Sequence, residues 1–187
     1  HIIPGEEYDD IAGLVNGFAA VKGKYEFRDL KLGSPYLSSA ADCDLMADIL
    51  IKRFAKDLAK KNTVIVLMGH GTPHHAANAM YSQLQLSLDK KAPGRFALGT
   101  GEAAPMIEDV IARLKHDKSV KTLVLSPLMI VAGDHANNDL ADKDDPESWY
   151  SQLKAAGYKD VRTFLVGLGE DADMARVYVS KIKDMMK

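Results

Sequence analysis

Three of the six histidines fall within residues 70–75, in the run MGHGTPHH, directly after the apolar stretch 63–67. Neutral imidazole can bind a metal ion or accept a proton near pH 7. His135 lies in a second polar stretch, AGDHANND, and Glu102 follows a further apolar run. Two imidazoles and a carboxylate from different strand ends form an N/O donor set. Such a set suits a borderline divalent metal such as Co²⁺, Ni²⁺, Fe²⁺ or Zn²⁺.

These residues also have ordinary structural interpretations. A histidine after a strand often only hydrogen-bonds the backbone, and His74 and His75 at a helix start are typical surface residues. Asp134 and Asp139 suit turn caps. The glycines of GHGTP and GLGED match neither a Walker loop nor GxGxxG, and no GxSxG elbow is present. The residue types and spacings alone therefore predict an α/β protein with a histidine-containing cleft.

Strands and helices alternate along most of the chain. Apolar runs predict strands over 63–67, 95–100, 121–125 and 161–165, and helical periodicity predicts helices over 74–90, 105–116, 146–156 and 172–186. This alternation is typical of a parallel sheet with helices on both faces. Ligands bind at the carboxyl ends of such strands. The loops 69–75, 100–105, 126–139 and 166–171 are therefore the candidates for function.

The first third of the chain is less regular. We predict a helix over 6–21, a short strand over 25–30 and a long helix over 39–61 that Ser38 or Ser39 caps. The long helix presents one apolar face, made of Leu45, Ile49, Leu50, Phe54 and Leu58. It is the expected connection between two domains. The predicted division is 1–38 as the remainder of an N-terminal domain, 39–61 as the connecting helix, 62–170 as a C-terminal α/β domain and 171–187 as a final helix.

Composition narrows the class of protein. The 187 residues are 47% hydrophobic and 27% charged, with a net charge of −2, as in an ordinary globular protein. Neither a basic stripe nor an apolar run of about 20 residues is present, so we expect no nucleic-acid or membrane partner. A homo-oligomer is left open. The single cysteine, Cys43, excludes an internal disulfide and permits a reducing compartment. We expect a cytoplasmic protein, with a periplasmic form left open.

The chain opens as HIIPGEEYDD, without an initiator methionine and with the apolar stub His1–Ile3 already in progress. We expect this stub to be the tail of a strand whose beginning lies upstream. Residues 1–35 would then need a preceding segment to cover their apolar surfaces.

Several long stretches together resemble one known family. MGHGTPHH, PLMIVAGDHANND, the ESW of residues 147–149, GLGE of residues 167–170 and the opening HIIPGEEY are similar, in this order, to the CbiK-type sirohydrochlorin cobalt chelatases. The resemblance spans essentially the whole chain. It implies a chelatase-like fold of two similar α/β domains, each a small parallel sheet flanked by helices. The N-terminal domain would be only partly present here.

The resemblance also implies roles for particular residues. His70 and His135 match the two metal-binding histidines of the family, and Glu7 matches an acid that faces the same centre. His70 and Glu7 would also act in catalysis. Substrate contacts would come from His74, Glu102, Gly133 and Asp134. Pro4 and Glu6 depart from the family pattern and alter the setting of Glu7.

The implied reaction inserts Co²⁺ into sirohydrochlorin, without ATP, and expels two pyrrole protons. Fe²⁺ or Ni²⁺ insertion into the same or a related tetrapyrrole is the enzymatic alternative, because N/O ligands do not select among these ions by type. A metal or haem carrier without catalytic activity is the alternative from another class. His1 could serve an intersubunit haem or metal site in such a carrier.

Overall fold

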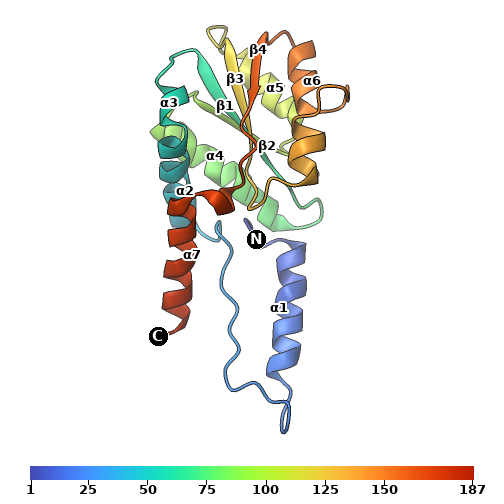
Figure 1. Cartoon of the computed structure of the whole chain (residues 1–187), viewed down its shortest axis with the longest axis vertical. Coiled ribbons are helices and arrows are strands. Elements are labelled where there is room, and N and C mark those ends of the chain that lie inside the picture. The colour runs from blue at the N-terminus through green and yellow to red at the C-terminus, as the bar shows by residue number, and fades with distance from the viewer.

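In a computed structural model that describes residues 1–187, a four-stranded parallel sheet is flanked by helices (Figure 1). The strands are β1 (Thr63–Gly69), β2 (Phe96–Thr100), β3 (Thr122–Pro127) and β4 (Asp160–Thr163), in the order β2-β1-β3-β4. Every residue of β1, β2 and β3 is buried. Burial on both faces explains why these strands read as continuous apolar runs. The expected α/β class with a small parallel sheet is confirmed.

Two layers of helices enclose the sheet. One face is covered by α2 (Ala40–Arg53), α3 (Ala55–Leu58), α4 (Ala79–Lys91) and α7 (Ala172–Met185), and the other by α5 (Ile107–Lys115) and α6 (Trp149–Ala155) (Figure 1). Side chains of β1 alternate between these layers. Ile65 and Leu67 pack in the first core, whereas Val64, Val66 and Met68 pack in the second.

Three short turns complete the elements. They are η1 (Ala76–Asn78), the π-helical η2 (Ala136–Leu140) and η3 (Leu168–Glu170). The helix expected from His74 begins only at Ala79, because η1 precedes it and His75 caps η1 through Nδ1, which accepts from the Ala77 N–H at 3.0 Å. His74 is therefore outside the helix, and that boundary was wrong.

The helix expected over residues 39–61 is interrupted. It consists of α2 and α3, separated at Phe54, whose φ of −99° and ψ of 17° leave the helical region. Ile49, Leu50 and Phe54 are buried as expected. Leu45 is 46% exposed, so its expected place on the buried face was wrong.

Ser39 begins α2 as its N-cap. The Ser39 hydroxyl accepts a hydrogen bond from the Asp42 N–H at 3.1 Å, which satisfies one free donor of the first turn. We expect Ser39→Ala to lower the free energy of unfolding by about 1 kcal/mol. Urea titration of the variant measures this loss. Ser82→Ala, at an exposed position inside α4, should change stability by less than about 0.5 kcal/mol.

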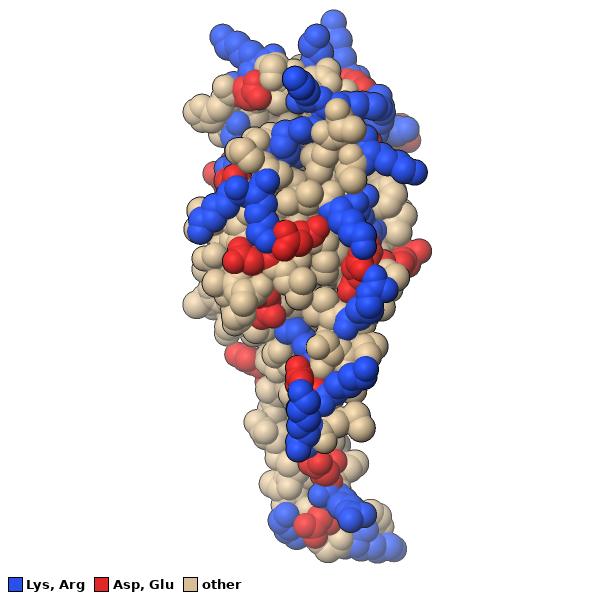
Figure 2. Space-filling model, turned by 90° about the vertical axis from the view of Figure 1, so that its left-hand side faces the viewer, with Lys and Arg blue, Asp and Glu red and all other residues tan.

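On the outer face of the α2–α7 pair, Lys and Arg side chains stand beside Asp and Glu (Figure 2). Lys52 lies 2.6 Å from Asp173 of α7, and Lys181 of α7 lies 3.5 Å from Asp42. Lys52 is 73% exposed, and an ion pair with so exposed a member contributes little to stability. Met174 of α7 is fully buried in the first core, and Val177 and Tyr178 of α7 pack against that core.

Residues 25–30 do not form the expected strand. They include a turn at Tyr25 and a bend at Arg28, they pair with no strand, and Tyr25 and Phe27 are 73% and 51% exposed. β-propensity reflects packing against neighbouring strands more than an intrinsic backbone preference, and no strand lies beside this segment. The strand prediction was therefore wrong.

The N-terminal segment meets the sheet only near its two ends. Ile2, Ile3, Tyr36 and Leu37 are buried in the same core as α2 and α4. Between them, α1 (Glu6–Ala19) has no buried residue and extends away from the sheet (Figure 1). No helix in the structure is long and apolar enough to cross a membrane.

Candidate metal centre at the carboxyl ends of the strands

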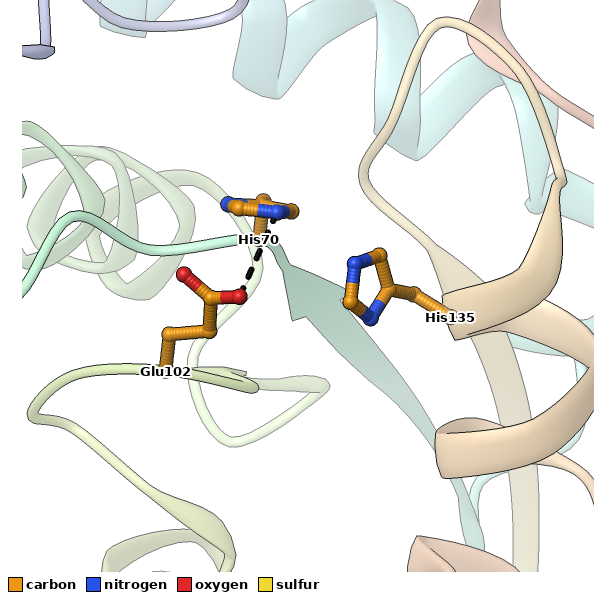
Figure 3. A group of neighbouring side chains, drawn as sticks. All are labelled: His70, Glu102 and His135. Carbon is orange, nitrogen blue, oxygen red and sulfur yellow. Dashed lines mark ion pairs between the residues drawn. The ribbon is translucent and has the colours of Figure 1, made fainter. Parts of the chain in front are cut away.

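Three side chains that lie far apart in the sequence meet beyond the carboxyl ends of the strands. His70 follows β1, Glu102 follows β2 and His135 follows β3 (Figure 3). One ligand atom from each lies within 4.8 Å of the others. The structure thus brings together the two imidazoles and the carboxylate that the sequence pattern singled out.

The strand order explains why these residues meet. β1 and β3 are neighbours, but α4, which follows β1, and α6, which follows β3, cover opposite faces of the sheet. The loops that leave the two strands therefore diverge and open a crevice, which is the usual ligand position in open α/β sheets. His70 and His135 lie on the two sides of this crevice.

Backbone hydrogen bonds hold His70 beside Glu102. The His70 carbonyl accepts from the Gly101 N–H at 3.1 Å and from the Glu102 N–H at 3.0 Å. Gly71 makes this approach feasible, because its φ is +101° and a Cβ there would lie 2.9 Å from Thr100 Oγ1. Only glycine adopts that conformation readily. The loops after β1 and β2 are therefore fixed to each other.

His135 sits at the start of η2, within the long loop after β3. Its Nδ1 lies 2.6 Å from Asp139 Oδ2. The chain before it is fixed by the loop after β4, because the Leu168 N–H donates to the Met129 carbonyl at 2.8 Å and the Gly169 N–H to the Ile130 carbonyl at 2.9 Å. Two separate loops therefore determine where His135 lies.

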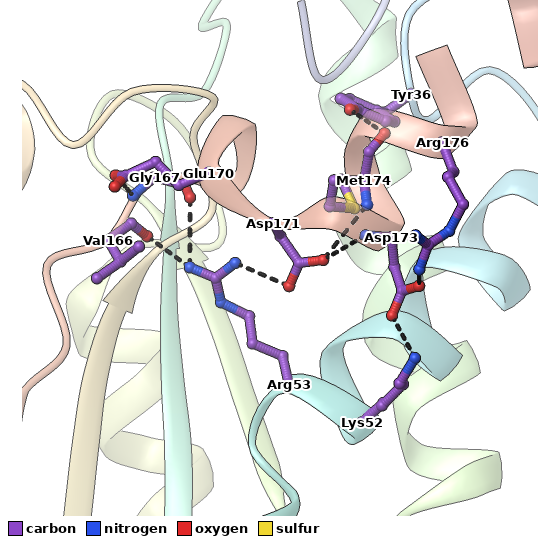
Figure 4. A network of polar contacts seen from close by, with 10 residues as sticks. All are labelled: Tyr36, Lys52, Arg53, Val166, Gly167, Glu170, Asp171, Asp173, Met174 and Arg176. Atoms are coloured by element: carbon purple, nitrogen blue, oxygen red, sulfur yellow. Dashed lines mark hydrogen bonds and ion pairs between the residues drawn. The ribbon is translucent and has the colours of Figure 1, made fainter. Parts of the chain in front are cut away.

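Arg53 anchors the loop after β4 in turn. Its guanidinium donates to the Val166 carbonyl at 2.8 Å and to Asp171 Oδ2 at 3.1 Å, and its side chain is only 6% exposed (Figure 4). Asp171 also caps α7 by accepting from the N–H groups of Asp173 and Met174. A charge-assisted network therefore connects the end of α2 to the loop that supports His135.

The three side chains combine partial exposure with close approach. Their exposed fractions are 39% for His70, 43% for Glu102 and 45% for His135. His70 Nε2 lies 3.5 Å from Glu102 Oε1, and the imidazole centroids are 4.8 Å apart at an interplanar angle of 87°. Two nitrogens and one carboxylate can hold a borderline divalent ion, and three ligands leave positions open for a second molecule.

A cavity of about 270 Å³ adjoins His70 on the side of the N-terminal segment. Its lining combines a carboxylate and a phenol with apolar side chains, and consists of His1, Ile2, Ile3, Glu7, His70, Gly71, Tyr81, Leu128, Met129 and Ile130. Tyr81 is 1% exposed, and burial raises its pKa to about 12, so the hydroxyl stays protonated at neutral pH. Glu7, expected among the metal ligands, lies in this cavity and outside the group of His70, Glu102 and His135.

The remaining predicted site residues are outside the three-residue group. His74, Gly133 and Asp134 are exposed. His75 points to α1, where its Nε2 lies 3.1 Å from Asp9 Oδ2. His75 therefore connects α1 to the loop after β1.

Sequence reasoning missed two residues beside the group. Asp139 was interpreted as a turn cap, although its spacing of four residues from His135 is the spacing at which helical side chains meet. Tyr81 gave no separate signal, because a tyrosine on the buried face of a helix is an ordinary core residue. Only the structure shows that it borders the cavity beside His70.

A parallel α/β sheet with two imidazoles and a carboxylate beyond its carboxyl ends is the arrangement expected of an α/β protein that binds a divalent metal. The chain matches the family model described as cobalt chelatase (CbiK) over residues 1–187, and it belongs to that family. Over 182 residues it is 34% identical to the sirohydrochlorin cobaltochelatase of Salmonella typhimurium. The aligned region covers 97% of this chain and 64% of that protein. Over 159 residues it is also 33% identical to the sirohydrochlorin cobaltochelatase CbiKC of Nitratidesulfovibrio vulgaris. This aligned region covers 85% of this chain and 54% of that protein. The chain thus spans between about half and two thirds of the length of these curated relatives.

Proposed function

We propose that the protein containing this chain inserts Co²⁺ into sirohydrochlorin without ATP. The observation that carries the proposal is the meeting of His70, Glu102 and His135 within 4.8 Å, in a chain of the cobalt chelatase family. Both relatives described above are named as sirohydrochlorin cobaltochelatases. These names favour cobalt over iron or nickel, a choice that the donor set alone does not make.

The chemistry of insertion gives each group a task. Two pyrrole N–H protons leave the macrocycle and one dication enters, so the site needs donors for the metal and acceptors for two protons. The half-exposed imidazoles of His70 and His135 and the carboxylate of Glu102 would hold Co²⁺ from one side and leave coordination positions for the pyrrole nitrogens. Neutral imidazole and carboxylate are both suitable proton acceptors near pH 7.

The cavity beside His70 suits one edge of the macrocycle. At about 270 Å³ it is smaller than the roughly 300–1,000 Å³ of pockets that enclose whole ligands. Its apolar walls would contact ring carbons, and Tyr81 would offer a hydroxyl donor. Glu7 lies in this cavity, so we propose it as a proton acceptor at that edge and not as a metal ligand.

Initial rates of metallation test the proposal. The purified full-length protein is expected to convert an excess of sirohydrochlorin to its cobalt complex over many turnovers without added nucleotide, as followed by visible absorbance. Parallel reactions with Fe²⁺ and Ni²⁺ measure metal preference. Insertion of iron or nickel but not cobalt would overturn the choice of metal. Stoichiometric Co²⁺ binding without any product would instead indicate a carrier.

A further inference from the structure

Both histidines of the metal centre have one ring nitrogen engaged by an acceptor. His70 Nδ1 lies 3.0 Å from the Gly71 carbonyl oxygen, and His135 Nδ1 lies 2.6 Å from Asp139 Oδ2. A carbonyl and a carboxylate can only accept, so each Nδ1 must carry the proton. In neutral imidazole this leaves the lone pair on Nε2. The partners of Nδ1 therefore select the same tautomer at both histidines.

The free nitrogens face the third member of the group. His70 Nε2 lies 3.5 Å from Glu102 Oε1. Figure 3 shows one ring nitrogen of His135 on the side of the ring that faces His70 and the other on the side away from His70. Because Nδ1 is bonded to Asp139, the nitrogen that faces the group is Nε2. The tautomer selected at each ring thus directs a lone pair to the centre.

The Nδ1–H tautomer is maintained by different partners at the two histidines. The partner of His70 is a backbone carbonyl, held by a loop that is itself bonded to the loop after β2. The partner of His135 is one exposed side chain. Other acids of this loop are used in local turns: Asp142 Oδ1 accepts from the Asp144 N–H, and Asp145 Oδ1 from the Glu147 N–H, both within 2.9 Å. The orientation of His135 therefore depends on Asp139.

We propose that Asp139 is a positioning residue that holds His135 in the Nδ1–H tautomer and presents its Nε2 to the incoming divalent cation. Asp139 would not touch the metal itself. Carboxylate partners of this kind fix ring orientation and raise ligand basicity at many metal sites. This inference rests on the proposed function, since it assigns a role within the same centre.

Nitrogen NMR of the metal-free, full-length protein tests the tautomer directly. In the wild type both His70 and His135 should appear as Nδ1–H. In Asp139→Ala, His135 should lose this preference and populate the Nε2–H form, while His70 stays unchanged. An unaltered Nδ1–H signal for His135 in Asp139→Ala would overturn the proposal.

Co²⁺ binding supplies a second measurement. Asp139→Ala should weaken the affinity for Co²⁺ roughly 10- to 100-fold, the usual cost of losing such a partner, and should alter the visible d–d spectrum of the bound ion. Asp144→Ala is the matched control, because it removes the same charge from an exposed position in the same loop. It should leave both affinity and tautomer unchanged. An equal loss in the two variants would show that only net charge matters and would also overturn the proposal.

A conservative variant, Asp139→Asn, tests the proposal if Asp139→Ala does not fold. Asp139→Asn keeps an oxygen that can accept from Nδ1–H, so it should retain the tautomer and bind Co²⁺ more tightly than Asp139→Ala. If the tautomer is retained and Co²⁺ affinity still falls at least 100-fold below that of the wild type, the tautomer does not govern affinity and the inference fails. Neither measurement involves sirohydrochlorin. A wild-type protein without chelatase activity but with these effects intact would therefore contradict the proposed function alone.

Discussion

Replacement of His70 or of His135 by alanine is expected to lower the rate of cobalt insertion about 100-fold or more. Each change removes one of three candidate metal ligands whose ligand atoms lie within 4.8 Å, and with it a base close to the proposed metal position. Because both side chains are half-exposed and lie in loops, the free energy of unfolding should fall by about 0.5–3 kcal/mol, the usual range for a single substitution. Initial rates of cobalt–sirohydrochlorin formation and urea unfolding measure the two effects.

The double replacement gives the sharper result. Groups that act as a unit show strongly non-additive losses, so the variant lacking both imidazoles should be little slower than either single variant. His116→Ala is the control, because His116 is exposed at the end of α5 and away from the centre. It should retain wild-type turnover. Losses that multiply at the two positions, or normal turnover in His70→Ala, would contradict a shared metal site.

The repeating part of the fold could be predicted from the sequence because burial dictates it. β1 and β3 are enclosed on both faces, so their residues must be apolar throughout, and each strand is followed by a helix with one apolar face. The same kind of pattern gave a wrong strand prediction at residues 25–30. There the side chains suited a strand, but a strand also needs a neighbour, and a single sequence does not show whether one lies beside it.

The candidate site could be predicted to a similar extent. His70, Glu102 and His135 each follow a strand, and parallel strands bring their carboxyl ends to one edge of the sheet. Their proximity therefore follows from the topology. The role proposed for Asp139 depends on the π-helical η2 within a long loop, and loop conformation carries no simple periodicity. Glu7 comes from α1, whose position against the sheet depends on contacts of Ile2 and Ile3 that no local pattern reveals.

The loop after β4 supports the loop that carries His135, so we expect Gly167→Ala to lower both stability and Co²⁺ affinity. A Cβ at Gly167 would lie 2.4 Å from the Ile130 carbonyl oxygen and 3.0 Å from Val131 Cα. These are backbone atoms, so no change of rotamer can relieve the clash. The loop after β4 must separate from residues 129–132, which precede His135. We expect a stability loss of about 1–3 kcal/mol, as for other overpacked sites.

The displacement should also reach the candidate metal centre, because the hydrogen bonds from Leu168 and Gly169 to Met129 and Ile130 fix the start of the loop that carries His135. Co²⁺ affinity should therefore fall in Gly167→Ala even at temperatures where the protein stays folded, as measured by titration with Co²⁺ alone. Gly17→Ala is the matched control, since a Cβ at Gly17 in α1 would meet no atom within 4 Å. Alanine is also the better helix former, so this variant should lose neither stability nor affinity. Full Co²⁺ affinity in a destabilised but folded Gly167→Ala protein would show that the loop after β4 supports the fold and not the position of His135.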